Sequence, residues 1–226
     1  AAPTTKPQAT PAAATAEPEP EATAWYEPYA QEPDVAIDFD LLTRKNAAIY
    51  AWIRIPGTKI DYPIVHAIKN DAIYLNYDAY LNKSRAGAIF TDGWNADDFS
   101  DPDTFVFGHN MRDGSMFANL HYFRDGAFFD EHDIVYIYMD GIRLTYKIFA
   151  AYIGDSEHPL SKYDFTDKTV YASYLKSIFD RRDLGANIRD ISVTADDRIL
   201  TLCTCLTGKD DKRVLVQAVL VQNEKD

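Results

Sequence analysis

From Asp38 onward the chain is a succession of short apolar, β-branched and aromatic runs, each bounded by turn residues. Many short runs of this kind are typical of the strands of a β-barrel or a β-sandwich. The expected strands cover residues 51–55, 62–65, 88–91, 104–108, 134–139, 142–153, 191–194, 199–205 and 214–222. An Asp-Gly pair at 140–141 is a strong signal for a tight hairpin between two of them. The pattern predicts a mainly β domain.

A few helices are expected to interrupt these strands. Residues 116–122 and 168–180 have helical patterns, and the second is the longest in the domain. Asp38 is a plausible N-cap for a loosely periodic helical segment before the first strand. The predicted fold class is therefore mainly β with inserted helices, a β-rich α+β fold.

The first 34 residues differ in composition from the rest. They contain seven of the eleven prolines, ten alanines, no glycine, and one lysine against six acidic residues. Such a segment cannot bury enough apolar surface to offset the entropy of ordering, so residues 1–34 are predicted to be a flexible Pro/Ala/Glu-rich spacer. Trp25, Tyr26 and Tyr29 are the exceptions, and they are candidates for docking on the domain. The folded domain is expected to span residues 35–226.

Charge and cysteine content exclude several classes of protein. The formal net charge of −12 argues against nucleic-acid binding, which needs clustered Lys and Arg. No apolar run approaches the 18 or so residues of a transmembrane helix. Two cysteines in 226 residues exclude a disulfide scaffold. These exclusions leave an acidic globular domain.

The two cysteines, Cys203 and Cys205, lie two residues apart in an expected strand and so share one face of it. A disulfide between them would be strained, and no second cysteine pair or paired histidines complete a zinc site. One interpretation is two buried thiols that act as small hydrophobic groups. The other is a nucleophile, and the spacing alone does not decide between them.

The positions of three side chains favour the interpretation of Cys205 as a nucleophile. Cys205 ends its apolar run, and Arg213 begins the next strand, so a hairpin would place Arg213 nearly opposite Cys205. An arginine there lowers a thiol pKa and stabilises an oxyanion, although a solvated charge at a hairpin end is the simpler interpretation of Arg213 alone. His109 follows a strand that ends in Gly108, a common way to present a catalytic group. Together, Cys205, His109 and Arg213 form a candidate nucleophilic constellation.

Three segments of the sequence match motifs of a known protein family. Residues 201–205 read Thr-Leu-Cys-Thr-Cys, residues 108–117 read Gly-His-Asn-Met-Arg-Asp-Gly-Ser-Met-Phe, and residues 211–213 read Asp-Lys-Arg before an apolar strand. In this order and spacing they resemble the nucleophile, histidine and arginine segments of class B sortases, the surface-protein transpeptidases of Gram-positive bacteria. Further segments that fit the class B pattern are Trp52-Ile53 and residues 60–65, 74–76 and 87–90.

This resemblance, which runs from about Asp38 to Val221, implies an eight-stranded sortase-type β-barrel with N-terminal helices. It also implies a helix between strands six and seven, where residues 168–180 fall. Residues 35–226 would then be the catalytic domain. Many class B members carry serine where this chain has Cys203, so the second thiol is a departure from the family, expected to line or pack the site.

The activity implied by the resemblance is acyl transfer without a metal or organic cofactor. Cys205 would attack the carbonyl after the threonine of a C-terminal sorting signal resembling NPxTx and form a thioester. His109 would protonate the leaving amine, and Arg213 would hold the substrate and the oxyanion. An amine of a peptidoglycan precursor or cross-bridge would then take the surface protein. Expected substrate contacts are Asn76, Ser156, Leu160, Cys203 and Thr204.

Other interpretations remain open at this point. A pilin-polymerising sortase would use a pilin lysine as the acceptor, and a non-catalytic sortase-like surface module would leave the thiols inert. The acid-rich segments 97–98 and 101–103 are expected to form a solvated loop, because they lack the spacing of a calcium loop. The resemblance implies a location at the extracellular face of a Gram-positive cell membrane, with the anchor in a segment upstream of Ala1.

Overall fold

A computed structural model describes residues 36–67 and 71–225 of the chain. The expected spacer over residues 1–34, with its three aromatic residues, lies outside this described part. Among the described residues, no helix is both long and apolar enough to cross a membrane.

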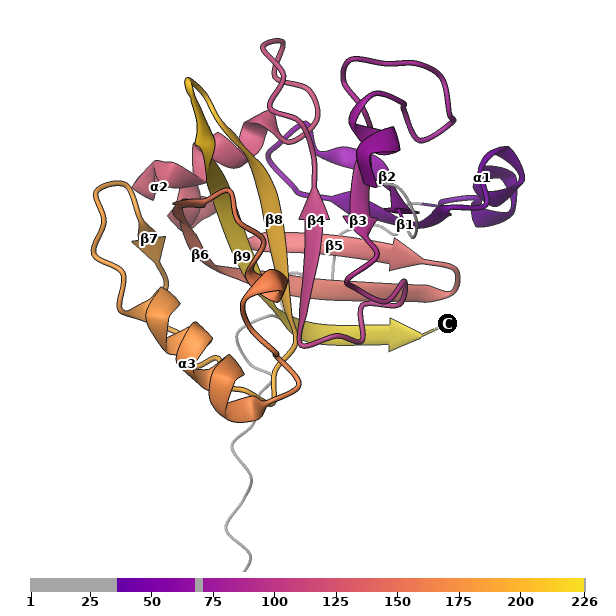
Figure 1. The fold of residues 1–226 in the computed structure, drawn as a ribbon. Coiled ribbons are helices and arrows are strands. Elements are labelled where there is room, and N and C mark those ends of the chain that lie inside the picture. Colours follow the sequence, from indigo (N-terminus) through magenta and orange to yellow (C-terminus); the bar gives the residue numbers. More distant parts are fainter. Residues whose placement is uncertain (1–35, 68–70, 226) are drawn as a thin grey trace, which may run out of the picture. The chain divides into compact units, whose positions relative to one another are not determined.

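The described residues contain nine strands and three α-helices (Figure 1). The strands are β1 (Ile49–Arg54), β2 (Asp61–Ala67), β3 (Ile89–Asp92), β4 (Asp103–Phe107), β5 (Ile134–Met139), β6 (Ile142–Asp155), β7 (Asn187–Ile188), β8 (Ile199–Leu206) and β9 (Lys209–Lys225). The helices are α1 (Phe39–Lys45), α2 (Gly126–Glu131) and α3 (Lys168–Phe179), with short 3₁₀ turns η2 (Asp71–Leu75), η3 (Ala118–Arg124) and η4 (Pro159–Ser161).

Eight of these strands close into a barrel. The sheet order is β5-β1-β2-β3-β4-β8-β9-β6-β7, and β5 also pairs with β6, which joins the ends and leaves β7 outside the ring. Pairing is antiparallel except between β2 and β3 and between β4 and β8. The β5–β6 hairpin turns at residues 140–141, where Met139 pairs with Ile142 and Gly141 has a φ of +64°, a conformation that favours glycine.

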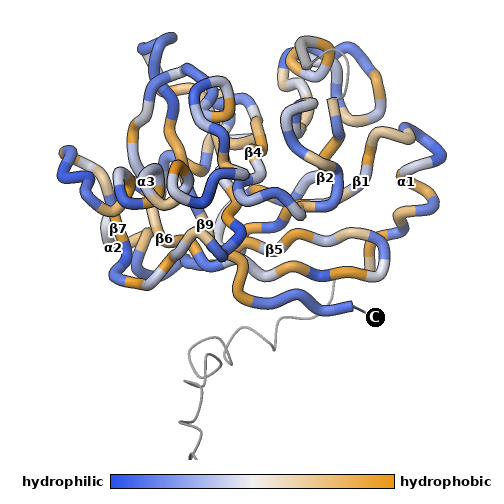
Figure 2. Tube along the Cα trace, turned by 60° about the horizontal axis from the view of Figure 1, so that its bottom comes forward, coloured by the Kyte–Doolittle hydropathy of each residue, from blue (hydrophilic) through white to orange (hydrophobic). Residues whose placement is uncertain are grey.

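Two apolar cores lie on the two sides of the wall formed by β4, β8, β9 and β6. The first fills the barrel and includes Leu200 and Leu202 of β8. The second lies between the outer face of this wall and α3, and includes Ile199 and Cys203 of the same strand. Because both faces are buried, β8 is apolar along most of its length and does not alternate. Hydrophobic segments accordingly follow the strands, while many connecting loops are hydrophilic (Figure 2).

Helix α3 covers the outer face of this wall because one side of it is apolar. Tyr171, Tyr174, Leu175 and Ile178 are buried, at the spacing that forms one stripe on an α-helix. The helix begins where the Asp167 side chain accepts hydrogen bonds from the first backbone N–H groups. Figure 1 shows α3 outside the barrel, between β6 and β8 in the chain. These are the sixth and seventh barrel strands, so the expected eight-stranded barrel and its inserted helix are confirmed.

Several local predictions need correction. Residues 191–194 form no strand, because Ile191 and Val193 pack against the outer core without pairing, and the short strand β7 lies earlier. The helical pattern at 116–122 is a 3₁₀ helix shifted to η3, and α2 was not predicted. One N-terminal helix, α1, lies in the described part, and its Asp38 N-cap is confirmed.

Asp103 does not belong to a solvated acidic loop as expected. It is the first residue of β4, it is 1% exposed, and it accepts a hydrogen bond from Thr201 Oγ1 at 2.8 Å. Burial raises its pKa well above the ordinary value, with the Thr201 hydrogen bond opposing the shift. The acid is therefore part of the packed sheet.

Candidate active site

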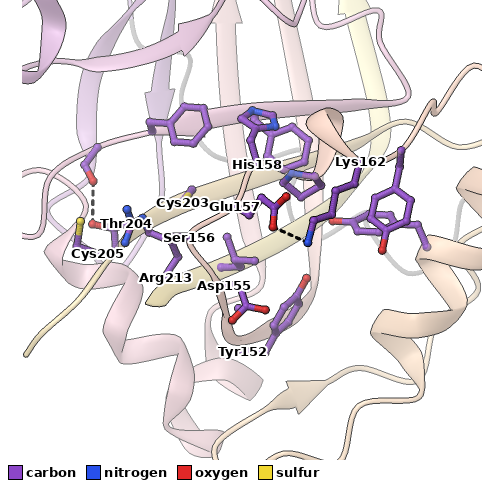
Figure 3. A pocket seen from close by; sticks show the side chains of 18 of the residues that line it. Tyr152, Asp155, Ser156, Glu157, His158, Lys162, Cys203, Thr204, Cys205 and Arg213 are labelled. Atoms are coloured by element: carbon purple, nitrogen blue, oxygen red, sulfur yellow. Dashed lines mark hydrogen bonds and ion pairs between the residues drawn. The ribbon is translucent and has the colours of Figure 1, made fainter. Parts of the chain in front are cut away.

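A pocket of about 340 Å³ lies on the outer face of the barrel, at the end of β8 that carries Cys205 (Figure 3). Its floor is formed by β4, β8, β9 and β6, and its walls by the segment after β6 and by α3. The side chains around it come from seven parts of the chain: Leu75, Phe90, Phe105, Phe107, His109, Tyr152, Asp155, Ser156, Glu157, His158, Pro159, Lys162, Tyr163, Tyr174, Ser177, Arg181, Cys203, Thr204, Cys205, Arg213 and Leu215.

The strand register brings Cys205 and Arg213 together. Cys205 of β8 pairs with Arg213 of β9, as the sequence predicted, and Arg213 pairs in turn with Gly154 of β6. A Cβ atom at Gly154 would lie 2.7 Å from Leu215 Cδ1, so a larger residue there would require the Leu215 side chain to move. Figure 3 shows Cys205 and Arg213 side by side at one end of the pocket.

The two thiols have different environments. Cys203 is 7% exposed, while Cys205, at the end of the strand, is exposed. Burial raises the pKa of Cys203 to about 12, against a lowering by the Arg213 charge and a smaller raising by Cys205. Because the thiolate is the reactive form of a cysteine, burial and the raised pKa disfavour reaction at Cys203, and Cys205 is the accessible thiol.

Backbone carbonyls hold the guanidinium of Arg213 in place. Its Nη1 donates to the carbonyl oxygens of Asp210 at 2.8 Å and Lys212 at 3.0 Å. The group remains partly exposed and lines the pocket. Arginine carries five N–H donors, so these contacts leave donors available for a group bound beside Cys205.

His109 reaches the same pocket from the end of β4. The preceding Gly108 must be small, because a Cβ there would lie 2.5 Å from Ile89 Cδ1 and 2.7 Å from Phe117 Cγ. The Nε2 atom of His109 lies 2.9 Å from the carbonyl oxygen of Leu75, which only accepts. In the neutral ring Nε2 therefore carries the proton, and Nδ1 is the nitrogen that can take up or release another.

The segment after β6 forms one wall and is tied to its surroundings. Asp155 pairs with Lys212 at 2.5 Å, and Ser156 N–H donates to the carbonyl of Asp211 at 3.0 Å. Farther on, His158 Nδ1 accepts from the N–H of Leu160 at 3.1 Å, and its Nε2 lies 3.2 Å from Asp92 Oδ2. The wall is thus attached to both β9 and β3.

Six of the eight residues predicted for the site line the pocket, and two do not. Ser156, Cys203 and Thr204 line the pocket with the three central residues. Asn76 is exposed and its neighbour Leu75, the last residue of η2, lines the pocket instead. Leu160 turns away to a second cavity of about 390 Å³ beside Trp94 and packs on the outer core.

The sequence analysis missed the far end of the pocket. Tyr152 and Tyr174 lie there, with the guanidinium of Arg181 at 4.0 Å from the centre of the Tyr152 ring. Tyr152 is two residues before Gly154 on β6, and Tyr174 and Arg181 belong to α3 and the residues after it. Their approach depends on how α3 docks, which the linear pattern does not reveal.

Comparison with known proteins gives the same assignment. The Sortase domain family matches residues 53–221. Sortase B of Listeria monocytogenes is 36% identical over 183 residues, covering 80% of this chain and 72% of that protein. The crystal structure of Clostridium perfringens sortase B has a TM-score of 0.73 at 33% identity and covers 82% of this chain and all of that one. A Staphylococcus aureus sortase B–substrate complex has a TM-score of 0.71 at 29% identity, covering 80% and 83%. The chain belongs to the sortase family of cysteine transpeptidases, in its class B.

Proposed function

We propose that this protein cleaves a C-terminal sorting signal resembling NPxTx after its threonine and transfers the upstream surface protein to a cell-wall amine. The observation that carries the proposal is the convergence of Cys205, Arg213 and His109 on one pocket, with Cys205 and Arg213 paired across two strands. These are the groups that an acyl transfer through a thioester requires. A catalytic role explains an exposed thiol beside an arginine and a histidine better than a structural role does.

In the first half-reaction the thiolate of Cys205 attacks the carbonyl carbon of the threonine. A C–S bond forms, and the carbonyl oxygen becomes an oxyanion, which Arg213 stabilises by charge and hydrogen bonding. When the tetrahedral species collapses, the C–N bond breaks and the departing amine takes a proton from His109. The products are a thioester on Cys205 and the free C-terminal fragment.

In the second half-reaction an amine of a peptidoglycan precursor or cross-bridge attacks the thioester. His109, now neutral, takes the proton of the incoming amine, and Arg213 stabilises the second oxyanion. Collapse breaks the C–S bond, returns the thiolate to Cys205 and leaves a new amide bond. Each turnover therefore restores the starting protonation of both groups.

The lining of the pocket supports a peptide substrate in an extended conformation. Phe107 and Leu215 supply apolar surface on the floor, and Ser156 supplies a hydroxyl group on the wall. The Thr204 hydroxyl is buried and donates to the carbonyl of Gly108 at 2.8 Å. Ser156 belongs to the segment after β6 that forms one wall, and in this proposal it would contact the sorting peptide. Apolar walls with a few polar groups are typical of specific ligand pockets.

The location and partners follow from the same proposal. The substrates are surface proteins that carry sorting signals, and the acceptor is part of the cell wall, so the enzyme works at the extracellular face of the membrane. An anchor upstream of Ala1 would hold it there, and residues 1–34 would act as the spacer between anchor and catalytic domain.

Mass spectrometry with synthetic peptides tests the function. NPxTx-type and LPxTG-type peptides are incubated with the protein, with and without a glycine or diamine acceptor, beside the Cys205→Ala and Cys203→Ala variants. We expect cleavage after threonine, an acyl-enzyme on Cys205, an amine-dependent product, and complete loss in Cys205→Ala alone. Cleavage that survives Cys205→Ala, or no cleavage of any such peptide, contradicts the proposal.

A further inference from the structure

The wall of the pocket, residues 156–162, is attached to the sheet at its start and again farther along. At its start, the N–H of Ser156 donates to the carbonyl of Asp211 on β9 at 3.0 Å. The second attachment is His158 (Figure 3), whose Nε2 lies 3.2 Å from Oδ2 of Asp92, the last residue of β3. The wall segment therefore spans from β9 to β3.

The ring of His158 fills the corner between the wall segment and the floor of the pocket. Its centre lies 4.6 Å from the ring centre of Phe105 and 5.5 Å from that of Phe107, both on β4. The ring of Trp94 lies at 6.0 Å. Because three aromatic rings pack around it, the imidazole has a fixed orientation, and each of its nitrogens faces one partner.

The hydrogen bonds of this ring assign its proton. Nδ1 accepts from the N–H of Leu160 at 3.1 Å and caps η4, so the ring proton is on Nε2. Nε2 is buried, and its contact with Asp92 lacks the alignment of a hydrogen bond, so the attraction between them is electrostatic. His158 thus has two separable tasks: Nδ1 caps η4, and Nε2 faces a carboxylate.

Asp92 has few other partners. Its side chain is 7% exposed, and its Oδ1 accepts from the N–H of Trp94 at 3.0 Å. Among the residues that the structure describes, no lysine or arginine pairs with this carboxylate. A buried carboxylate is costly unless polar groups face it, so the N–H of the His158 ring lowers the free energy of the arrangement in which the wall segment lies against β3.

We propose that His158 is a positioning residue that, through Asp92, holds the wall segment in place before the sorting peptide binds. This inference rests on the proposed function. Ser156 and Glu157 lie between the two attachments and line the pocket. Without the second attachment, binding would have to order this stretch, and the apparent affinity for the peptide would fall with the fraction of molecules in which the wall is in place.

This role predicts an effect on KM and not on kcat. The nucleophile, the proton donor and the oxyanion-binding cation are Cys205 on β8, His109 after β4 and Arg213 on β9, none of which belongs to the wall segment. Once the peptide is bound, the contact between His158 and Asp92 is the same in the ground state and in the transition state. Loss of such an interaction raises KM and leaves kcat unchanged.

Two substitutions separate the two tasks of the ring. Asparagine is a good N-cap but is too short to reach Asp92, so His158→Asn keeps the cap of η4 and loses the contact. Glutamine is longer and carries an N–H near the position of Nε2, so His158→Gln keeps the contact and loses the cap. Asp92→Asn removes the charge and keeps an acceptor for the N–H of Trp94. His132→Asn is the matched control, because His132 packs on Phe128 at 4.2 Å and lines neither cavity.

Steady-state cleavage of a fluorogenic sorting peptide gives kcat and KM for each variant. We expect KM to rise about 5- to 30-fold in His158→Asn and in Asp92→Asn, the factor by which loss of one buried contact shifts an equilibrium. The value of kcat should stay within about twofold of wild type. His158→Gln should recover most of the affinity, and His132→Asn should match wild type. The double variant should be no worse than the weaker single variant, because both changes remove the same contact.

Hydrogen exchange of the substrate-free protein gives a second measurement that does not depend on activity. Amides of residues 156–163 should exchange faster in His158→Asn and in Asp92→Asn, by about the same factor as the rise in KM. Amides of β8 and β9 should exchange as in wild type, because the change is confined to the wall segment.

The proposal is overturned if KM and the exchange of the wall segment are unchanged in both His158→Asn and Asp92→Asn. Impairment of His158→Gln without impairment of His158→Asn also overturns it, because the ring would then act only as the cap of η4. A fall in kcat without a rise in KM would overturn it by placing His158 in the chemical step. If wild-type protein cleaves no sorting peptide, the proposed function fails, while the exchange rates still decide whether His158 holds the wall segment.

Discussion

Replacing Arg213 by glutamine tests whether this side chain stabilises the transition state or only the local fold. Glutamine keeps N–H donors and much of the length but removes the charge. At an effective dielectric of about 20, a unit charge about 4 Å from an oxyanion contributes about 4 kcal/mol. Loss of a single oxyanion donor in other enzymes costs about 2.7–4 kcal/mol, which agrees. We therefore expect kcat for the sorting peptide to fall about 10²- to 10³-fold.

The structural cost of the same change is much smaller. The Arg213 guanidinium makes two hydrogen bonds to main-chain carbonyls of a partly exposed turn, at 2.8 and 3.0 Å. Such bonds contribute about 0.5–1.5 kcal/mol each at most, and less where water can replace them. The free energy of unfolding in urea should drop by about 1 kcal/mol.

Arg182→Gln is the matched control, because Arg182 Nη1 also donates to two main-chain carbonyls, at 2.9 and 2.5 Å, but does not line the pocket. Arg213→Lys keeps the charge without the planar fork and should recover part of the activity. The assay is steady-state cleavage of a fluorogenic sorting peptide, with urea titration of each variant. A kcat for Arg213→Gln within a few-fold of that of Arg182→Gln would refute the reasoning.

Three further experiments test the environment of individual side chains. Iodoacetamide at pH 7 should add one adduct by intact mass, on Cys205, because burial raises the pKa of Cys203 to about 12; a second adduct should require unfolding. Gly108→Ala should lose about 1–3 kcal/mol in urea titration, because its Cβ would lie 2.7 Å from the Phe117 ring. Asp103→Asn should be more stable than wild type, with a margin that grows as pH rises from about 4 to 7. Burial raises the pKa of Asp103 in the folded state well above its ordinary value of 3.8. The stability that the bound proton contributes to wild type is therefore complete below about pH 3.8 and is lost as the pH rises toward the raised pKa.

Each of these three predictions would be contradicted by a specific result. Rapid double labelling of native protein would show that Cys203 is accessible. An unchanged urea midpoint in Gly108→Ala would mean that the neighbouring side chains move aside. Equal pH profiles for wild type and Asp103→Asn would show that burial does not shift the titration of this acid.

Much of the fold could be predicted because strands and turns leave local signals. The runs at 134–139 and 142–153 and the Asp-Gly turn between them correspond to β5 and β6, and the pattern at 168–180 corresponds to α3. The error at 191–194 has a physical origin, since Ile191 and Val193 alternate as in a strand and pack partly buried against the outer core, but the segment pairs with no strand of the described residues. An alternating pattern of apolar residues indicates that every second side chain is buried. It does not show that the segment pairs with a neighbouring strand.

Local patterns in the sequence determined the mainly β class and the helix at 168–180, and the resemblance to class B sortases supplied the barrel. The expected hairpin predicts that Arg213 lies opposite Cys205, but the register shifts between Cys205 and Leu206, so the turn alone does not set this pairing. Tertiary structure supplied the physical reason why Cys205 rather than Cys203 is the accessible thiol, since the burial that raises the pKa of Cys203 depends on packing between β8 and α3. It also placed Leu75 rather than Asn76 in the pocket and brought Asn110 and His121 to the Cys205 carbonyl. Those contacts join residues 84 to 95 positions apart, and no local rule of spacing specifies them.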